Sequence, residues 1–223
     1  MKNNQKGFTL VEIAIVLVII GLLLGGILKG QEMIIQAKIK NAITDFSGVS
    51  AAYFGYQDRY RATPGDDSGA GRWTGAIVTT TSDRILTGTY NFACPTAAIV
   101  GTPESCLWWD QLRRSGFLSG GGAAQPSNAF NGILGVQTGD AVTVPPAAVL
   151  PAVTGFTNLI MCSSNLPDKV AIALDVQMDD GVPNSGAVRG TLAAGQPDIL
   201  TTTVAPATYA ETGTGFYTLC RQF

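Results

Sequence analysis

The first long hydrophobic segment of the chain runs from Phe8 to Leu28. Its 21 residues contain one charged side chain, Glu12, and no proline. At a rise of about 1.5 Å per residue, a helix of this length spans about 31 Å, which matches the hydrocarbon core of a bilayer. The pattern therefore predicts one membrane-spanning helix over residues 8–28. A carboxylate is costly in such a helix, so Glu12 is expected to need a compensating partner.

The helix is predicted to continue beyond the membrane, because residues 29–60 carry an apolar stripe on one face. The spacing alternates between three and four residues, as in an amphipathic α-helix. The stripe consists of Ile35, Ile39, Ala42, Phe46, Val49, Tyr53, Tyr56 and Tyr60. We therefore expect one long helix over residues 8–60, whose second part packs on the chain's own globular domain. Pro64 and Gly65 end it, since proline disfavours helical geometry in the residue before it.

Glycines recur in the first half of this helix, at Gly21, Gly25, Gly26 and Gly30. Each costs about 1 kcal/mol relative to alanine in a helix interior. We therefore expect the helix to be interrupted near them. Close packing of small residues between neighbouring helices would explain the same glycines, and the two explanations are compatible.

The remaining residues, 61–223, predict one globular domain built mainly from strands. A short helix is expected over residues 104–118, with Gly116 at its C-terminal end. Runs of β-formers predict strands at residues 133–137, 159–162, 169–177, 187–192, 199–204 and 216–220. The third run is the most regular, since Val170, Ile172, Leu174 and Val176 alternate along it. These strands are expected to form an antiparallel sheet across the stripe of the long helix, which is an α+β fold.

The composition excludes several classes of function. The chain has no histidine, which excludes Ser-His-Asp and Cys-His nucleophiles and every histidine-ligated metal site. It has no P-loop and no G-x-S-x-G motif, and its paired acids are adjacent residues in predicted turns, unsuited to act as opposed acid and base. A net charge of −2 with 13% charged residues leaves no basic tract for nucleic acid. We therefore expect neither an enzyme nor a nucleic-acid-binding protein.

Four cysteines lie beyond the apolar segment, and none forms a C-x-x-C pair, which argues against zinc or thioredoxin-like chemistry. Four cysteines allow three pairings. We favour Cys94–Cys106 and Cys162–Cys220, because the first closes a local loop and the second fastens the C-terminal strand. Disulfides would place this part of the chain in an oxidising compartment.

A short polar leader with Lys2 and Lys6 precedes the apolar run and ends at Gly7. The run is longer than the 7–15 apolar residues of a secretory signal peptide, and no A-x-A-like cleavage site follows it before Lys29. The leader's lysines favour the cytoplasmic side, which places the rest of the chain outside. An ordinary signal anchor would account for the length and the lysines, but not for Gly7 or Glu12.

The segment from Lys6 to Glu12, KGFTLVE, resembles the N-terminus of type IV prepilins and type II secretion pseudopilins. That pattern is a short basic leader, a glycine, then F-T-L-x-E and an apolar helix. The resemblance implies that a membrane prepilin peptidase cuts between Gly7 and Phe8 and methylates the new amino group of Phe8. It also implies that Glu12 meets the Phe8 amine of a neighbouring subunit in a filament. An ammonium there would compensate a buried carboxylate.

The resemblance further implies a pilin-like fold, with a leader over 1–7, the long helix over 8–60 and a head domain over 61–223. Residues 59–67 (RYRATPGDD) and 107–117 (LWWDQLRRSGF) also look like stretches of large prepilin-like proteins. The function implied is that of a structural subunit of a type IV pilus or pilus-like filament.

The implied location is the inner membrane, with the head in the periplasm, followed by an extracellular pilus or a periplasmic pseudopilus. The implied partners are other copies of the chain, the prepilin peptidase and the inner-membrane assembly machinery. Two alternatives stay open. One is a type II secretion pseudopilin, and the other is a monomeric, signal-anchored periplasmic binding domain.

The densest cluster of oxygen ligands in the sequence comprises Asp179, Asp180 and Asn184. Calcium takes six to eight oxygen ligands, and some pseudopilins bind it between late strands, so a calcium site is one interpretation. The twelve-residue spacing of a calcium loop is missing, and Asp-Gly and Pro-Asn pairs are typical of turns. A simple turn is therefore preferred, and no other cofactor is expected.

Overall fold

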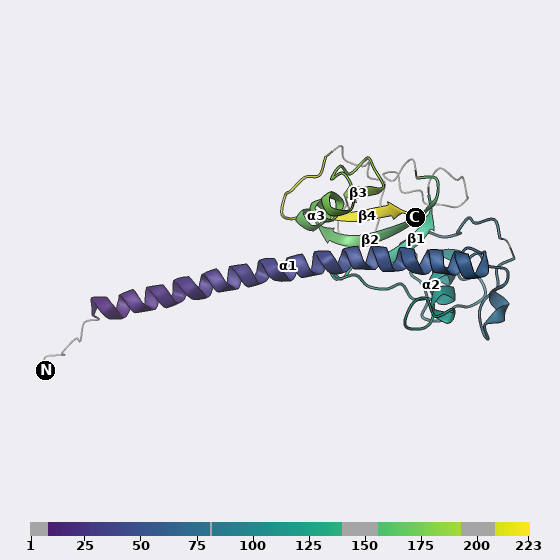
Figure 1. Cartoon of the computed structure of the whole chain (residues 1–223), viewed down its shortest axis with the longest axis horizontal. Helices are drawn as coiled ribbons and strands as arrows, with labels where there is room; N and C mark the ends of the chain where they lie inside the picture. Colours follow the sequence, from purple (N-terminus) through teal and green to yellow (C-terminus); the bar gives the residue numbers. More distant parts are fainter. Residues whose placement is uncertain (1–8, 81, 140–155, 193–207) are drawn as a thin grey trace. The chain divides into compact units, whose positions relative to one another are not determined.

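The computed structural model of the protein describes residues 9–80, 82–139, 156–192 and 208–223 (Figure 1). The elements in chain order are α1 (Leu10–Tyr60), a 3-10 helix η1 (Ala70–Arg72), α2 (Glu104–Arg114), β1 (Leu134–Thr138), β2 (Leu159–Pro167), α3 (Asp168–Met178), β3 (Val188–Leu192) and β4 (Phe216–Gln222). The chain forms two compact units, Met1–Lys38 and Ile39–Phe223. Helix α1 contributes to both, and each unit is described by itself.

The described part of the first unit is the N-terminal part of α1. The helix passes through Gly21, Gly25, Gly26 and Gly30 without a break, so the expected interruption is wrong for the isolated chain. The physical reason is that each glycine adds a cost of only about 1 kcal/mol, while the leucines between them are good helix formers. Apart from the adjacent backbone of the helix itself, a Cβ added at any of the four would meet no atom within 4 Å. Packing inside the chain therefore does not require these glycines.

The second unit contains a four-stranded antiparallel sheet in the order β1-β2-β4-β3. Its central pair, β2 and β4, sets Cys162 directly opposite Cys220. Figure 1 shows both this sheet and α2 against the C-terminal part of α1. The predicted pilin-like α+β fold, a long helix on an antiparallel sheet, is confirmed.

The apolar stripe of α1 forms the centre of the core of this unit. Seven residues of the helix are buried: Ile39, Ala42, Phe46, Val49, Ala52, Tyr53 and Tyr56. The later ones share a cluster with the α2 residues Trp108, Trp109 and Leu112 and with the strand residues Leu134, Val136, Leu159 and Met161. The earlier ones, Ile39 and Ala42, pack with residues of α3, β2, β3 and β4. The period of the stripe therefore predicted which face of the helix is buried.

Residues 169–177 form most of helix α3, so the predicted strand there is wrong. The buried positions are Val170, Ala171, Leu174 and Asp175, which recur with helical spacing, whereas Val176 is 60% exposed. Pro167 precedes the helix and supplies no N–H, which is tolerated only where a helix starts. Backbone N–H groups of Lys169, Thr212 and Gly213 donate to the Asp168 carboxylate at 2.6–2.7 Å. These bonds hold the first turn in place.

The other predicted elements are found with small shifts at their ends. The predicted helix at 104–118 is α2, and Gly116 follows it with φ of +83°. The strands predicted at 133–137, 159–162, 187–192 and 216–220 correspond to β1, β2, β3 and β4. The strand predicted at 199–204 lies outside the described residues.

Candidate functional site

The N-terminus of α1 is closed by two side chains. Thr9 precedes the helix, and both its N–H and its hydroxyl donate to Glu12 Oε2 at 2.8 Å. The N–H of Glu12 donates to Thr9 Oγ1 at 3.3 Å. This reciprocal arrangement is a capping box, which satisfies backbone donors that a helix start leaves unpaired. It holds the Glu12 carboxylate at the first turn of the helix.

This role of Glu12 was not predicted, although its signal is present in the sequence. The segment Thr9-Leu10-Val11-Glu12 has the T-x-x-E spacing of a capping box before an apolar run. The proposed cleavage and methylation residues, Gly7 and Phe8, lie outside the described residues. Their roles therefore stay predictions.

The N-terminal part of α1 presents an apolar surface on all sides. An 18-residue window has a mean hydropathy of 2.8, and none of it is buried inside the protein, so by length and composition this helix can cross a membrane. Several apolar side chains are more than 60% exposed: Leu10, Val11, Leu17, Val18, Leu22 and Leu28. A surface of this extent marks contact with lipid or with other protein. Between Leu10 and Leu28, Glu12 is the one charged side chain.

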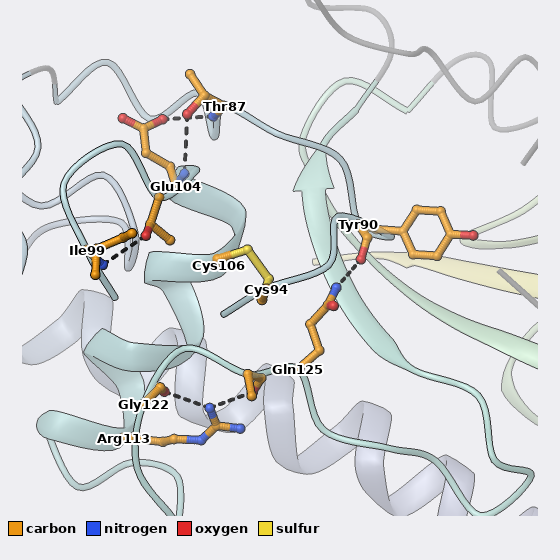
Figure 2. Close-up of a disulfide and its surroundings, with 11 residues drawn as sticks. Thr87, Tyr90, Cys94, Ile99, Glu104, Cys106, Arg113, Gly122 and Gln125 are labelled. Carbon is orange, nitrogen blue, oxygen red and sulfur yellow. Dashed lines mark hydrogen bonds between the residues drawn. A yellow bond between two sulfur atoms is a disulfide. The ribbon is translucent and has the colours of Figure 1, made fainter. Parts of the chain in front are cut away.

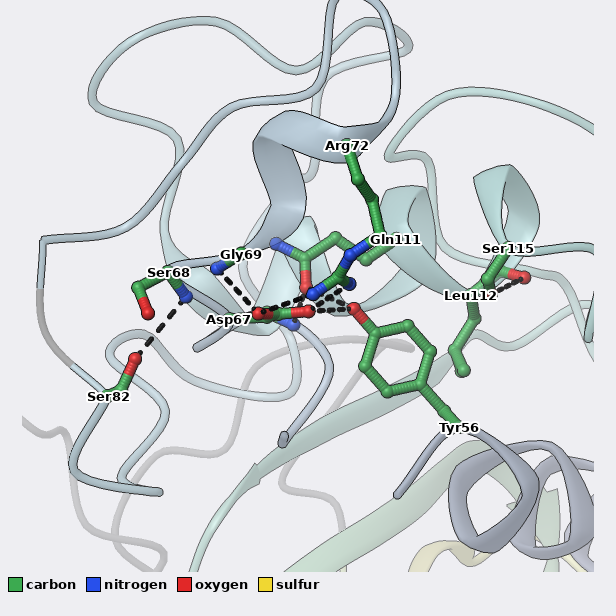
Figure 3. A network of polar contacts seen from close by, with 10 residues as sticks. Tyr56, Asp67, Ser68, Gly69, Arg72, Ser82, Gln111, Leu112 and Ser115 are labelled. Atoms are coloured by element: carbon green, nitrogen blue, oxygen red, sulfur yellow. Dashed lines mark hydrogen bonds and ion pairs between the residues drawn. The ribbon is translucent and has the colours of Figure 1, made fainter. Parts of the chain in front are cut away.

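A buried polar network fastens the end of α1 to the rest of the second unit (Figure 3). At its centre, the Asp67 carboxylate accepts hydrogen bonds from the Tyr56 hydroxyl at 2.6 Å and from the Gly69 N–H at 2.7 Å. Arg72 pairs with the same carboxylate at 2.6 Å. The Gln111 side-chain oxygen accepts from the Gly65 N–H at 2.7 Å, which joins α2 to the turn after α1. We call Tyr56, Asp67, Arg72 and Gln111 the anchor network.

The two neighbouring acids of this turn have opposite electrostatic environments. Burial raises the pKa of Asp66 to about 6, and the nearby carboxylates of Glu104 and Asp83 add to the effect. Burial also acts to raise the pKa of Asp67, but hydrogen bonds from Arg72 and Tyr56 outweigh it, so its pKa is lowered. One acid is therefore strained when ionised and the other is stabilised. Both carboxylates accept hydrogen bonds from groups of this turn or of the segments beside it.

Both disulfides join the pairs favoured from the sequence. Cys94 is bonded to Cys106 with a Cα–Cα distance of 5.4 Å, and Cys162 to Cys220 with 4.0 Å. Figure 2 shows the first of them beside the start of α2, where the Thr87 N–H donates to the Glu104 carboxylate at 2.8 Å. The bond therefore ties the loop before α2 to the helix.

The predicted calcium residues lie in the loop between α3 and β3. Oxygens of Asp175, Asp179 and Asp180 lie within 4.8 Å of one another. Asn184 is exposed and does not belong to this group. Asp175 was missed because its segment was predicted to be a strand, whereas the helix turns it toward the loop.

Most of these carboxylate oxygens already accept hydrogen bonds from the protein. The donors are the N–H groups of Gly181, Val182 and Val188 and the hydroxyls of Ser185 and Tyr209. Five of the six oxygens are engaged in this way, and only Asp179 Oδ1 receives none of these bonds. These hydrogen bonds are typical of a turn whose acids bond to nearby N–H and hydroxyl groups. They occupy most of the carboxylate oxygens, whereas calcium takes six to eight oxygen ligands. Calcium binding at Asp179, Asp180 and Asn184 stays the alternative interpretation, and the simple turn stays the preferred prediction.

Residues 2–28 match the family model of the prokaryotic N-terminal methylation motif. The matched segment contains the leader, the F-T-L-V-E sequence and the apolar part of α1. It supports the class of leader found in type IV prepilins and pseudopilins, and with it a pilin-type or pseudopilin-type subunit anchored by its N-terminal helix. No curated protein and no solved structure matches the chain.

Proposed function

We propose that this protein is a structural subunit of a type IV pilus or pilus-like filament that polymerises through α1. The observation that carries the proposal is the single carboxylate of Glu12, in the first turn of a helix whose apolar surface is uncovered. The methylation motif over residues 2–28 implies processing by a prepilin peptidase and assembly into a pilus. The role is structural and needs no catalytic group.

The order of events follows from the leader. The chain is inserted with Lys2 and Lys6 on the cytoplasmic side and the head in the periplasm, where its two disulfides form. Cleavage after Gly7 creates an amino group on Phe8, which is then methylated. This amine is the cation that a neighbouring copy brings to Glu12 when the apolar helices leave the lipid and pack against one another.

The capping box sharpens this mechanism. Hydrogen bonds from Thr9 satisfy one carboxylate oxygen but bring no positive charge. In an apolar environment the remaining charge is costly until a cation lies beside it. Pairing with the Phe8 amine of another copy therefore favours the filament over the single inserted chain.

The test separates the charge of Glu12 from its capping role. Glu12→Gln should leave insertion, cleavage and methylation intact but abolish filaments, because no anion remains to pair with the amine. Thr9→Val removes the capping hydroxyl and keeps the acid, so filaments should still form. Glu32→Gln is the matched control on the same helix, since Glu32 pairs with Lys29 at 2.7 Å on an exposed surface.

Electron microscopy detects filaments, and mass spectrometry of the N-terminal peptide detects cleavage and methylation. Normal filaments from Glu12→Gln would refute the pairing role. If Thr9→Val abolishes filaments as completely as Glu12→Gln, capping and not charge pairing is the role of the acid. An intact Met1 in the membrane form would instead support the signal-anchored monomer. If the unaltered chain forms no surface filaments and Glu12→Gln abolishes protein secretion, the secretion pseudopilin would be favoured.

A further inference from the structure

The second unit contains a cavity of about 340 Å³ beside α1. Its walls come from α1, the loop before α2, the end of β1, the start of β2 and the last residue. The lining residues include the rings of Tyr53, Phe54 and Phe223 and neutral polar side chains such as Thr157 and Asn158. This volume is at the lower end of the range of about 300–1,000 Å³ for small-molecule sites. The mixture of rings and polar groups indicates a ligand with one apolar and one polar side.

The aromatic side of the cavity has one ring, that of Phe54, that is exposed among the described residues. Between Ile39 and Tyr60, Phe54 is the one large apolar side chain that is more than half exposed, at 53%. Its ring centroid lies 5.2 Å from that of Tyr53, which in turn lies 4.8 Å from that of Phe223. The three rings therefore form a continuous apolar wall, and Phe54 presents its outer part to solvent.

The polar side of the cavity contains one charged side chain, Arg84. Its backbone has φ of +65°, which is rare for a residue other than glycine, and its N–H donates to the buried Asp66 carboxylate at 2.5 Å. Backbone held in this conformation is common at binding sites, where surrounding contacts fix it. Among the described residues, the Arg84 guanidinium, the Thr157 hydroxyl and the Asn158 amide have no hydrogen-bond or ion-pair partner. Three polar groups are therefore available at one cavity.

We propose that this cavity binds an acidic saccharide, a sugar unit that carries a carboxylate. A pyranose ring offers an apolar C–H face to the aromatic wall and hydroxyls to Thr157 and Asn158. Its carboxylate matches the planar fork of the Arg84 guanidinium, which binds such groups with two parallel hydrogen bonds. Arg84, Thr157 and Asn158 are exposed to solvent, and a purely apolar ligand would displace water from them without replacing its hydrogen bonds.

The binding experiment uses the full chain in a detergent without a sugar headgroup. Digalacturonate is titrated by calorimetry, with the neutral disaccharide cellobiose as the comparison ligand. Digalacturonate should bind, and cellobiose should bind about tenfold more weakly or worse, because it lacks the group that pairs with Arg84. High salt should weaken digalacturonate binding and leave cellobiose unaffected.

The variants identify the site. Arg84→Asn removes the charge and suits a positive φ, so it should weaken digalacturonate binding about tenfold. Arg61→Asn is the matched control, because Arg61 is an exposed arginine with φ of +56° that does not line the cavity. Phe54→Ala should weaken both disaccharides. Asn158→Asp keeps the size of the side chain and places a negative charge at the cavity, so it should oppose the acidic sugar alone.

Several results would overturn the proposal. They are an absence of digalacturonate binding, equal affinity for both disaccharides, or unchanged affinity in a folded Arg84→Asn or Asn158→Asp variant. Light scattering adds a further outcome. Self-association that Phe54→Ala abolishes would show that the cavity is an interface between copies of the chain. Binding is measured on the unassembled chain, so the result is independent of filament formation.

Discussion

Replacing each acid of the Asp66-Asp67 pair with asparagine should change stability in opposite directions. The Asp67 carboxylate is 4% exposed and receives hydrogen bonds from Tyr56, Gly69 and Arg72. A hydrogen bond to a charged group contributes about 1.5–3 kcal/mol, and asparagine can keep only part of this set. Since Arg72 is one-third exposed and regains water, Asp67→Asn should cost about 3 kcal/mol of unfolding free energy.

Asp66→Asn should instead stabilise the protein at neutral pH. The ionised carboxylate is 1% exposed, and one of its oxygens has no hydrogen-bond partner. Its pKa is about 6 in the folded chain against an ordinary value of 3.8. At about 1.4 kcal/mol per pH unit, the ionised form costs at most about 3 kcal/mol of stability at pH 8. Asparagine keeps an oxygen for the Arg84 N–H and removes this cost.

The pH dependence separates the two variants. The raised pKa of Asp66 means that the folded chain binds more protons than the unfolded chain between about pH 4 and 6, so this group's contribution falls as pH rises. The gain from Asp66→Asn should therefore be near zero at pH 4 and complete at pH 8. The lowered pKa of Asp67 places its stabilisation above pH 3.8 and loses it only as pH falls through the folded pKa, so the penalty of Asp67→Asn should be alike at pH 4 and 8.

Urea denaturation of the detergent-solubilised chain measures these differences by linear extrapolation. Tryptophan emission reports on the second unit alone, because all three tryptophans, Trp73, Trp108 and Trp109, lie in it. Asp58→Asn is the control, since its ion pair with Arg61 is 3.9 Å long and exposed. Equal destabilisation by Asp66→Asn at both pH values would refute the assignment of a strained ionised acid. An unchanged free energy of unfolding in the Asp67→Asn variant would refute the anchor network as a source of stability.

Two further changes test the packing of the second unit. Replacing both Cys162 and Cys220 with alanine should lower the free energy of unfolding by about 4 kcal/mol in the chain-entropy model, against about 3 kcal/mol for Cys94 and Cys106. The difference arises because the sequence separations of the two pairs are 58 and 12. Urea titration measures the two losses of stability, and non-reducing peptide mapping checks the disulfide that remains in each variant. Gly65→Ala should cost about 3 kcal/mol or more, since φ is +85° and a Cβ would lie 2.4 Å from a backbone oxygen of α2, and an unchanged urea midpoint would contradict this.

The sequence predicted the long helix and its buried face well because the signal is long and periodic. The stripe extends over residues 35–60, so single exceptions do not hide its period. Ile35 is such an exception, because it is 47% exposed, whereas Ile39 to Tyr56 are buried as expected. The disulfide pairs could also be predicted, since a short loop and a C-terminal strand favour one of the three pairings that four cysteines allow.

The third helix was not predictable in the same way, because eleven residues admit two periods. Val170, Ile172, Leu174 and Val176 alternate as in a strand, while Val170 and Leu174 alone also fit a helix. The deciding contacts come from Thr212 and Gly213, more than forty residues away, which close the first turn on Asp168. The anchor network was hidden for the same reason. No local pattern shows that Asp67 will meet Tyr56 and Arg72 in a buried position while Asp66 meets a backbone N–H.

The capping box explains why an acid at this position would suit a chain that, under the proposed function, exists both as a single inserted helix and as part of a filament. A single helix in a membrane needs its first turn closed, and Glu12 does this with Thr9 at 2.8 Å. The same carboxylate keeps a negative charge that neutral donors cannot cancel. In the proposed filament, each processed copy would bring one amine at Phe8 and one carboxylate at Glu12, so the filament would neutralise its own charges in equal number. Glutamine would serve the first state and fail in the second, which is why Glu12→Gln, with Thr9→Val beside it, decides between the two roles.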